Sequence, residues 1–80
     1  MNYNKLAVYI TETSKDICRE NDCTEEEHNC ESYAYFTIDH EIVDICYPDY
    51  ILSACDIALP LPFNGTGIEL KQALEYYSDN

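Results

Sequence analysis

The sequence predicts a small α+β domain in which two helices flank a central antiparallel β-hairpin. Three observations lead to this class. Apolar residues recur with a helical period near both ends of the chain, at residues 3–20 and about 67–78. Between them, two runs rich in β-branched and aromatic residues, about 32–38 and 41–46, alternate as strands do. Because the chain has 80 residues, we expect a single domain over 1–80 with a small core.

The first predicted helix spans residues 3–20. Its apolar stripe runs from Tyr3 through Leu6 and Ile10 to Cys18, and the charged residues lie off this stripe. A strand over residues 6–10 is the alternative, because apolar residues also alternate there. The continuation of the stripe to Cys18 favours the helix.

Two capping boxes predict further helix starts. Thr24 followed by Glu27 indicates a helix of only one or two turns, since no apolar stripe follows it. Thr66 followed by Glu69 opens the C-terminal helix at about 67–78. The apolar stripe of that helix consists of Leu70, Ala73, Leu74 and Tyr77.

The hairpin is predicted with Asp39 and His40 as a two-residue loop; a longer loop is the alternative, because Asp-His is a poorer turn pair than Asn-Gly. This loop pairs Ile38 with Glu41 and therefore sets Phe36 opposite Val43 and Ala34 opposite Ile45. One face of the hairpin is then apolar and should be buried. It consists of Ala34, Phe36, Ile38, Val43 and Ile45.

Residues 48–58 are predicted to form a short helix with Pro48 at its first position. Each of the prolines at 60 and 62 pushes the preceding residue out of the helical region, so residues 59–62 should be extended. The hairpin is thus the only β structure that the sequence predicts.

The net charge of −12 is the strongest functional signal, with sixteen acidic residues against four basic ones. The basic residues are Lys5, Lys15, Arg19 and Lys71, which are too few to neutralise nucleic-acid phosphates directly. The charge also exceeds the magnitude of about 2–8 that solubility asks for. We therefore predict a protein partner with a Lys/Arg-rich surface. The apolar run over residues 6–10 is too short for a signal peptide or a membrane span, so a cytoplasmic protein is expected.

Acidic residues and interleaved tyrosines in the central region are the predicted partner contacts. Carboxylates on a rigid surface can approximate the spacing of phosphates, and tyrosine rings can stack on arginines. The predicted contacts are Glu25, Glu26, Glu27, Glu31, Tyr33, Tyr35, Asp39, Glu41, Asp44, Tyr47, Asp49, Tyr50 and Asp56.

Cys18, Cys23, His28 and Cys30 are the candidate metal ligands. Their spacing departs from the two close ligand pairs of common zinc sites, since His28 and Cys30 are one residue apart and Cys18 lies in a predicted helix. We therefore predict no metal and no cofactor, and small buried or free thiols instead. An enzyme is not expected, because an acidic field raises the pKa of a cysteine and two glycines cannot make a phosphate-binding loop.

Small size, strong acidity and the absence of a catalytic motif resemble phage-encoded inhibitors of host defence, which include anti-CRISPR proteins and other DNA mimics. The resemblance is one of size and composition, carried by the acids between Glu20 and Asp56. It implies an inhibitor that occupies the basic channel of a CRISPR–Cas effector or nuclease and blocks target DNA binding. An immunity protein or antitoxin against a basic nuclease, and a small zinc-binding adaptor, remain alternatives. Both a monomer and a homodimer fit the sequence.

Overall fold

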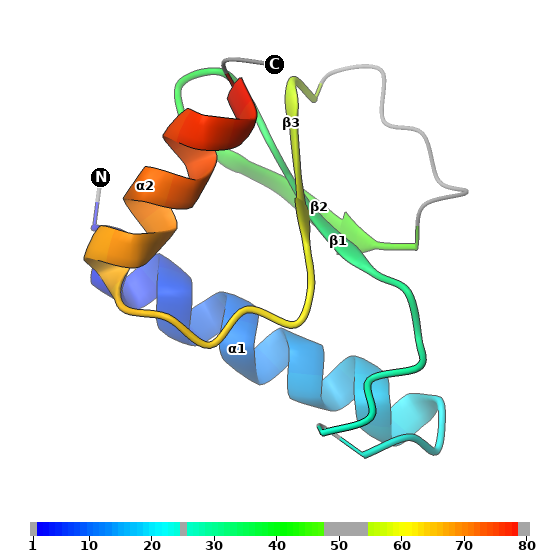
Figure 1. Cartoon of the computed structure of the whole chain (residues 1–80). Coiled ribbons are helices and arrows are strands. Elements are labelled where there is room, and N and C mark those ends of the chain that lie inside the picture. The colour runs from blue at the N-terminus through cyan, green and yellow to red at the C-terminus, as the bar shows by residue number, and fades with distance from the viewer. Residues whose placement is uncertain (1, 25, 48–54, 79–80) are drawn as a thin grey trace.

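The computed structural model describes residues 2–24, 26–47 and 55–78 of the 80-residue chain. Its elements are, in order, α1 (Tyr3–Glu20), β1 (Tyr33–Phe36), β2 (Ile42–Cys46), β3 (Ile57–Pro60) and α2 (Gly67–Ser78). The strands form one antiparallel sheet in the order β2-β1-β3. The two helices pack against each other beside this sheet, with α2 next to β3 (Figure 1). The predicted α+β class is confirmed, but the sheet has three strands instead of the two of a hairpin.

Helix α1 has the predicted bounds. Asn2 is its N-cap, and the Asn2 Oδ1 atom accepts a hydrogen bond of 3.1 Å from the Lys5 N–H. The buried residues Ala7, Ile10, Ser14 and Cys18 are three or four positions apart, as one face of a helix requires. The alternative strand over residues 6–10 is therefore excluded.

Helix α2 also has the predicted bounds, and its capping box is formed. The Thr66 N–H donates to Glu69 Oε1 at 3.2 Å, while the Glu69 N–H donates to Thr66 Oγ1 at 3.3 Å. Gly67 lies directly against the start of α1, where a Cβ atom would stand only 2.6 Å from the Asn4 backbone nitrogen. A glycine at this position lets the two helices approach closely.

The loop of the hairpin is the longer alternative, because it contains three residues, 38–40, instead of two. The Thr37 N–H donates to the Glu41 carbonyl, and the His40 N–H donates to the Thr37 carbonyl, both at 2.9 Å. His40 has a φ of 66°, which makes this a turn closed by a left-handed residue. The Tyr3 hydroxyl of α1 lies 2.8 Å from His40 Nδ1 and holds the ring of this residue.

The register of the hairpin is partly as predicted. Ala34 pairs with Ile45, but Phe36 pairs with Ile42 and not with Val43, because a β-bulge between Tyr35 and Phe36 shifts the pairing by one residue. The bulge turns Ile42 toward the core and leaves Val43 38% exposed. Ile38, also predicted to be buried, lies in the loop and is 65% exposed. Two of the five residues predicted for the buried face are therefore wrong.

Strand β3 corrects the prediction of a helix over residues 48–58. Residues 48–54 of that prediction lie outside the described residues, but Ile57 and Ala58 belong to β3. Ile57 and Leu59 are buried and Ala58 and Pro60 are exposed, which is the alternation of a strand. Pro60 is tolerated because β3 is an edge strand, where a missing N–H costs no ladder bond.

Helices α1 and α2, strands β1 and β3 and the segment directly after β3 contribute buried side chains to one core. These are Ala7, Ile10, Ala34, Phe36, Ile57, Leu59, Leu61, Leu70 and Leu74. Strand β2 adds partly buried Ile42 and Ile45. Neither helix of the described residues combines the length and the apolar character that crossing a membrane requires.

Candidate functional site

The C-terminal end of α1 brings two cysteines together. Asn21 is the C-cap, and Asp22 follows with a φ of 54° in the left-handed region. The Cys23 N–H then donates to the Cys18 carbonyl at 3.0 Å, and the Asp22 N–H donates to the Arg19 carbonyl at 3.3 Å. These two bonds define a Schellman motif, in which the residue after the left-handed one contacts the last turn of the helix. Cys18 and Cys23 are five positions apart, and the Schellman motif joins two residues at this separation, so it brings the two cysteines together.

A single turn then carries the chain to His28. The Glu27 N–H donates to Thr24 Oγ1 at 3.1 Å, and the His28 N–H donates to the Thr24 carbonyl at 2.8 Å. The predicted cap at Thr24 is thus present, but the described residues that follow it form a turn and not a helix. His28 has a φ of 33°, a conformation that residues other than glycine adopt rarely and that clusters at functional sites.

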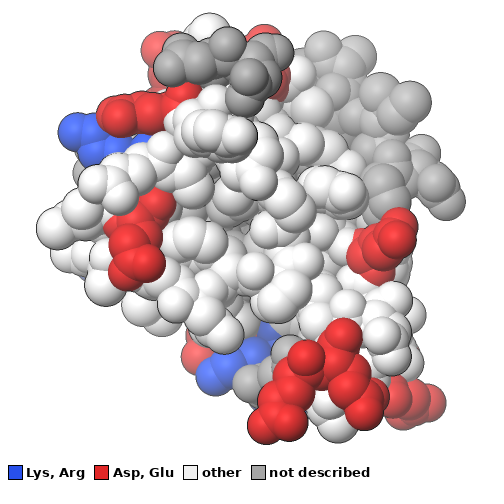
Figure 2. Space-filling view, in the orientation of Figure 1, with Lys and Arg blue, Asp and Glu red and all other residues white. Residues whose placement is uncertain are grey.

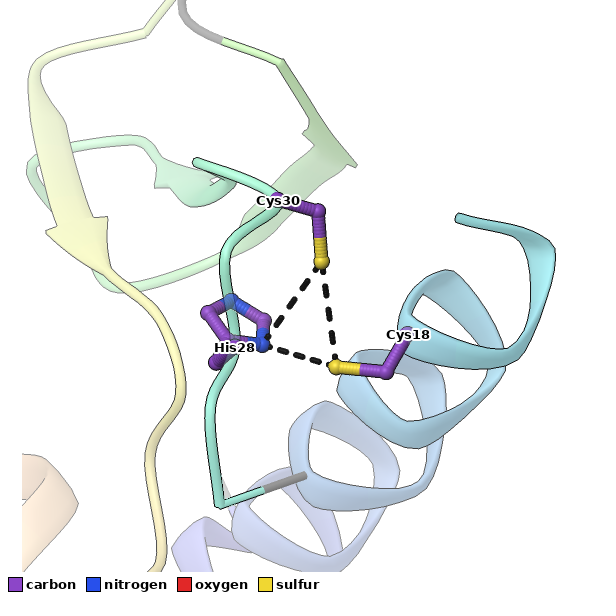
Figure 3. A group of neighbouring side chains, drawn as sticks. All are labelled: Cys18, His28 and Cys30. Atoms are coloured by element: carbon purple, nitrogen blue, oxygen red, sulfur yellow. Dashed lines mark hydrogen bonds between the residues drawn. The ribbon is translucent and has the colours of Figure 1, made fainter. Parts of the chain in front are cut away.

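Cys18, His28 and Cys30 point toward one another across the gap between α1 and the following loop (Figure 3). Cys18 Sγ lies 2.8 Å from His28 Nδ1 and 3.8 Å from Cys30 Sγ. Cys30 Sγ lies 3.8 Å from His28 Nδ1 and 3.2 Å from Cys23 Sγ. We call Cys18, Cys23, His28 and Cys30 the thiol–imidazole cluster.

Ser32 completes the surroundings of the histidine. Its side chain is 2% exposed, and its Oγ lies 3.3 Å from His28 Nε2. With a proton on Nε2, the imidazole donates to Ser32 and turns the lone pair of Nδ1 toward the sulfur atoms. The Ser32 carbonyl in turn accepts from the Leu61 N–H at 3.0 Å, which fixes this residue to the segment after β3.

The thiols of the cluster differ in pKa. The pKa of Cys18 is raised to about 12, first by burial and then by hydrogen bonds with Cys23 and Cys30. Burial likewise raises the pKa of Cys30. Burial acts in the same direction on Cys23, but hydrogen bonds from Cys30 and Cys18 outweigh it and lower the pKa of that thiol. The buried Cys18 thiol is therefore protonated and neutral at neutral pH.

Two features of the sequence weigh against a metal site: the place of Cys18 in a helix and the short spacing of His28 and Cys30. The structure has both features, and the donor atoms of these three residues still lie within 4.8 Å of one another. Cys18 does lie inside α1, but near its end, where the Schellman motif returns the chain. His28 and Cys30 are one residue apart, and the left-handed conformation of His28 lets both side chains face Cys18.

The predicted acidic contacts of the described chain are all exposed. They are Glu26, Glu27, Glu31, Asp39, Glu41, Asp44 and Asp56. Two of them have structural roles, because Asp44 Oδ1 accepts from the Ile45 N–H at 2.8 Å and Asp56 Oδ2 accepts from the Ile38 N–H at 3.0 Å. Within the described ranges, no hydrogen bond or ion pair uses the other five carboxylates. Glu25 and Asp49 lie outside the described residues.

These five carboxylates lie in two groups. Glu26, Glu27 and Glu31 form the loop group, after the C-terminal end of α1, while Asp39 and Glu41 form the hairpin group, beside the Tyr3 contact at its N-terminal end. Since α1 has 18 residues, about 27 Å of helix separates the two ends. On the face shown in Figure 2, acidic side chains likewise lie in separate places around a mostly uncharged centre. The loop group and the hairpin group therefore do not belong to one continuous track.

The predicted tyrosine contacts differ in accessibility. Tyr47 is exposed, and its hydroxyl accepts a hydrogen bond from Asn21 Nδ2 at the end of α1. Tyr33 is half-buried, and its ring centroid lies 6.3 Å from that of Tyr35. Tyr35 is only 7% exposed and donates its hydroxyl to the Tyr47 carbonyl at 3.3 Å, so it offers little surface to a partner. Tyr50 lies outside the described residues.

Ser32 is the site residue that sequence reasoning missed. A serine four residues after a histidine carries no recognisable signal, whereas the five-residue step from Cys18 to Cys23 across Asn21 and Asp22 could have revealed the Schellman contact. Comparison of the chain with protein-family models, curated proteins and solved structures finds no match.

Proposed function

We propose that this protein is an inhibitor that binds the Lys/Arg-rich nucleic-acid-binding surface of another protein and keeps nucleic acid out of it. The partner class that size and composition favour is a CRISPR–Cas effector or a nuclease of a host defence system. The inhibitor acts by steric and electrostatic exclusion, with no catalytic step and no contact of its own with nucleic acid.

The observation that carries this proposal is the uneven pairing of charge. Lys15 and Arg19 are paired on α1 with Glu12 and Asp16, at 3.7 Å and 2.6 Å. In the part of the chain that the structure describes, no ion pair involves the loop group or the hairpin group. These exposed carboxylates are therefore available to the cations of a partner.

The separation of the two acidic groups affects how such an inhibitor would bind. Groups at opposite ends of α1 can contact two cationic patches or one long channel, but they do not reproduce a regular row of phosphates. Opposite charges would speed association, and exposed pairs at the rim would make the affinity fall with salt. Specificity must then come from the shape of the described surface around the carboxylates, which includes exposed Tyr47.

The cysteines support an intracellular setting for this function. All five are free thiols, as is usual in a reducing compartment. We infer that the protein acts in the cytoplasm, which is the host cytoplasm if a phage encodes it.

A competition assay with matched charge changes tests the proposal. Capture from a host lysate at low salt supplies candidate partners, and a purified partner is then titrated against its labelled nucleic acid. The protein should displace the nucleic acid, and the double variant Glu26→Gln, Glu27→Gln should do so roughly tenfold more weakly. The control double variant Glu12→Gln, Asp16→Asn removes the same charge from paired acids and should compete like the parent.

Two results would contradict the proposal. One is equal competition by the parent and the Glu26→Gln, Glu27→Gln variant, and the other is an equal loss in the control. If the captured partner is instead a toxin nuclease that the protein covers, the same surface serves an immunity function.

A further inference from the structure

We propose that the thiol–imidazole cluster is a structural zinc site, in which Cys18, Cys23 and Cys30 supply three thiolates and His28 supplies Nδ1. This inference does not depend on the proposed inhibitor function. It rests on four independent features of the cluster: the distances between the donor atoms, the local conformations that bring them together, the second contact of the histidine, and burial.

The distances between donors fit a tetrahedral ion. Zinc–sulfur bonds of about 2.3 Å and zinc–nitrogen bonds of about 2.0–2.1 Å require edges of about 3.8 Å between sulfurs and about 3.6 Å between sulfur and nitrogen. The edge between Cys18 Sγ and Cys30 Sγ is 3.8 Å, and that between Cys30 Sγ and His28 Nδ1 is also 3.8 Å. Two edges of the tetrahedron are therefore already in place.

Two further edges are shorter, as hydrogen bonds between protonated groups are. Cys18 Sγ lies 2.8 Å from His28 Nδ1, and Cys23 Sγ lies 3.2 Å from Cys30 Sγ. Each pair must separate by less than about 1 Å to reach the tetrahedral edge. The Cys23 thiol must in addition swing toward Cys18 and His28, because in the described chain the donor atoms that all lie within 4.8 Å of one another are those of Cys18, His28 and Cys30. The bond from the Cys23 N–H to the Cys18 carbonyl keeps the Cys23 backbone beside the cluster.

Two left-handed residues build the site. Asp22, with a φ of 54°, returns Cys23 to the end of α1, and His28, with a φ of 33°, aims its ring and the following Cys30 at the same point. Backbone conformations of this kind are unfavourable for non-glycine residues and persist where surrounding interactions enforce them. At Asp22 the Schellman contact is such an interaction, and at His28 coordination of an ion would be another.

The second nitrogen of His28 has the partner that a metal-bound histidine needs. Metal-ligating histidines usually donate their other ring N–H to a fixed acceptor, which sets the tautomer and the orientation of the ring. Ser32 Oγ lies 3.3 Å from His28 Nε2 and is buried, so it is a positioning residue for the site.

The burial of the cluster fits a closed metal site. Cys18 and Cys30 are buried, so bulk water would not take up a position on an ion held between them. Binding of Zn²⁺ would release the three thiol protons to solvent and leave a site of net charge −1. Four protein ligands make the site closed, and a closed site is structural and not catalytic.

Cobalt substitution of the metal-stripped, reduced full chain tests the proposal without any variant. We expect one Co²⁺ per chain, with the intense visible bands of tetrahedral Co²⁺ and a thiolate-to-cobalt charge-transfer band. One equivalent of Zn²⁺ should bleach these bands. A weak octahedral spectrum would overturn the proposal, because the surface carboxylates and not the cluster would then hold the ion.

Variants assign the ligands. Cys23→Ser and His28→Asn should each weaken Zn²⁺ binding by at least about 100-fold, the asparagine being chosen because it tolerates positive φ. Cys46→Ser, a matched change on β2 outside the cluster, should bind Zn²⁺ like the parent. Parent-like affinity in both cluster variants would refute the assignment. So would a Cys23–Cys30 disulfide that persists in reductant and lowers the intact mass by two hydrogen atoms.

Discussion

Replacement of Ser32 by alanine separates the metal affinity of the cluster from the stability of the fold. The Ser32 hydroxyl is 2% exposed and lies 3.3 Å from His28 Nε2. The change removes this oxygen and little else, so the ring of His28 loses the acceptor that fixes its tautomer. The Ser32 backbone bond with Leu61 is unaffected.

The size of the effect follows from the single contact that is lost. A hydrogen bond of this kind contributes about 0.5–1.5 kcal/mol to the stability of the metal-free protein. Loss of an outer partner of a ligating histidine lowers metal affinity by roughly 10–100-fold, which corresponds to about 1.4–2.8 kcal/mol. Ser32→Ala should therefore reduce the free energy of zinc binding by more than it reduces the unfolding free energy of the metal-free protein.

Competition for Zn²⁺ with a chromophoric chelator measures the affinity, and urea unfolding of the metal-free protein measures the stability. Ser14→Ala is the matched control, because Ser14 is a second buried serine and lies on the same face of α1 as Cys18. It should leave zinc affinity unchanged, whatever it does to stability. A Ser32→Ala protein with parental zinc affinity, or an equal loss of affinity in the control, would refute the role assigned to Ser32.

Three further predictions concern the fold that supports the sites. Asp22→Gly should be more stable to urea than Asp22→Ala by about 1 kcal/mol. Both variants lose the charge, but only glycine accepts the φ of 54° freely. Equal stabilities of the two variants would contradict the left-handed conformation at this position. Tyr3→Phe should cost about 1 kcal/mol in the parent and much less in a His40→Gly background, and a double-mutant cycle without coupling would contradict their 2.8 Å contact. Leu70→Ala, at a position 0% exposed, should cost about 2–5 kcal/mol, whereas Ile68→Ala, at a position 72% exposed, should change the unfolding free energy by less than about 0.5 kcal/mol.

The helices could be predicted from the sequence because their signals are local. Asn2 and Thr66 cap the two helices by bonds to residues three positions away, and the apolar stripes repeat within each helix. Strand β3 could not be predicted in this way, because its partner β1 is distant in the chain and Pro60 weakens the local β signal. The length of the hairpin loop stayed open between two residues and more, because Asp-His is a weak turn pair and the contact of His40 with Tyr3 joins residues 37 positions apart.

The candidate sites were harder to predict than the helices. Spacing rules for zinc ligands describe a compact local motif, whereas here one candidate ligand comes from the end of a helix and the others from the loop that folds back over it. The acidic composition was evident, but its distribution was not. Only the fold shows that α1 separates Glu26, Glu27 and Glu31 from Asp39 and Glu41.

The loop between α1 and β1 carries both the loop group of carboxylates and three residues of the thiol–imidazole cluster. The metal and the carboxylates can be removed one at a time, so an experiment can test the two proposals separately. The loop group of carboxylates lies on the same segment that the cluster would tie to α1. An ion at the cluster would order this segment before a partner arrives and so reduce the entropy lost on binding. Removal of the metal should then weaken partner binding although every carboxylate remains, while the Glu26→Gln, Glu27→Gln variant should weaken it although the metal remains. Each change leaves the other feature intact. If only the metal-free protein or only the Glu26→Gln, Glu27→Gln variant loses partner binding, the result identifies which feature of the loop the partner requires.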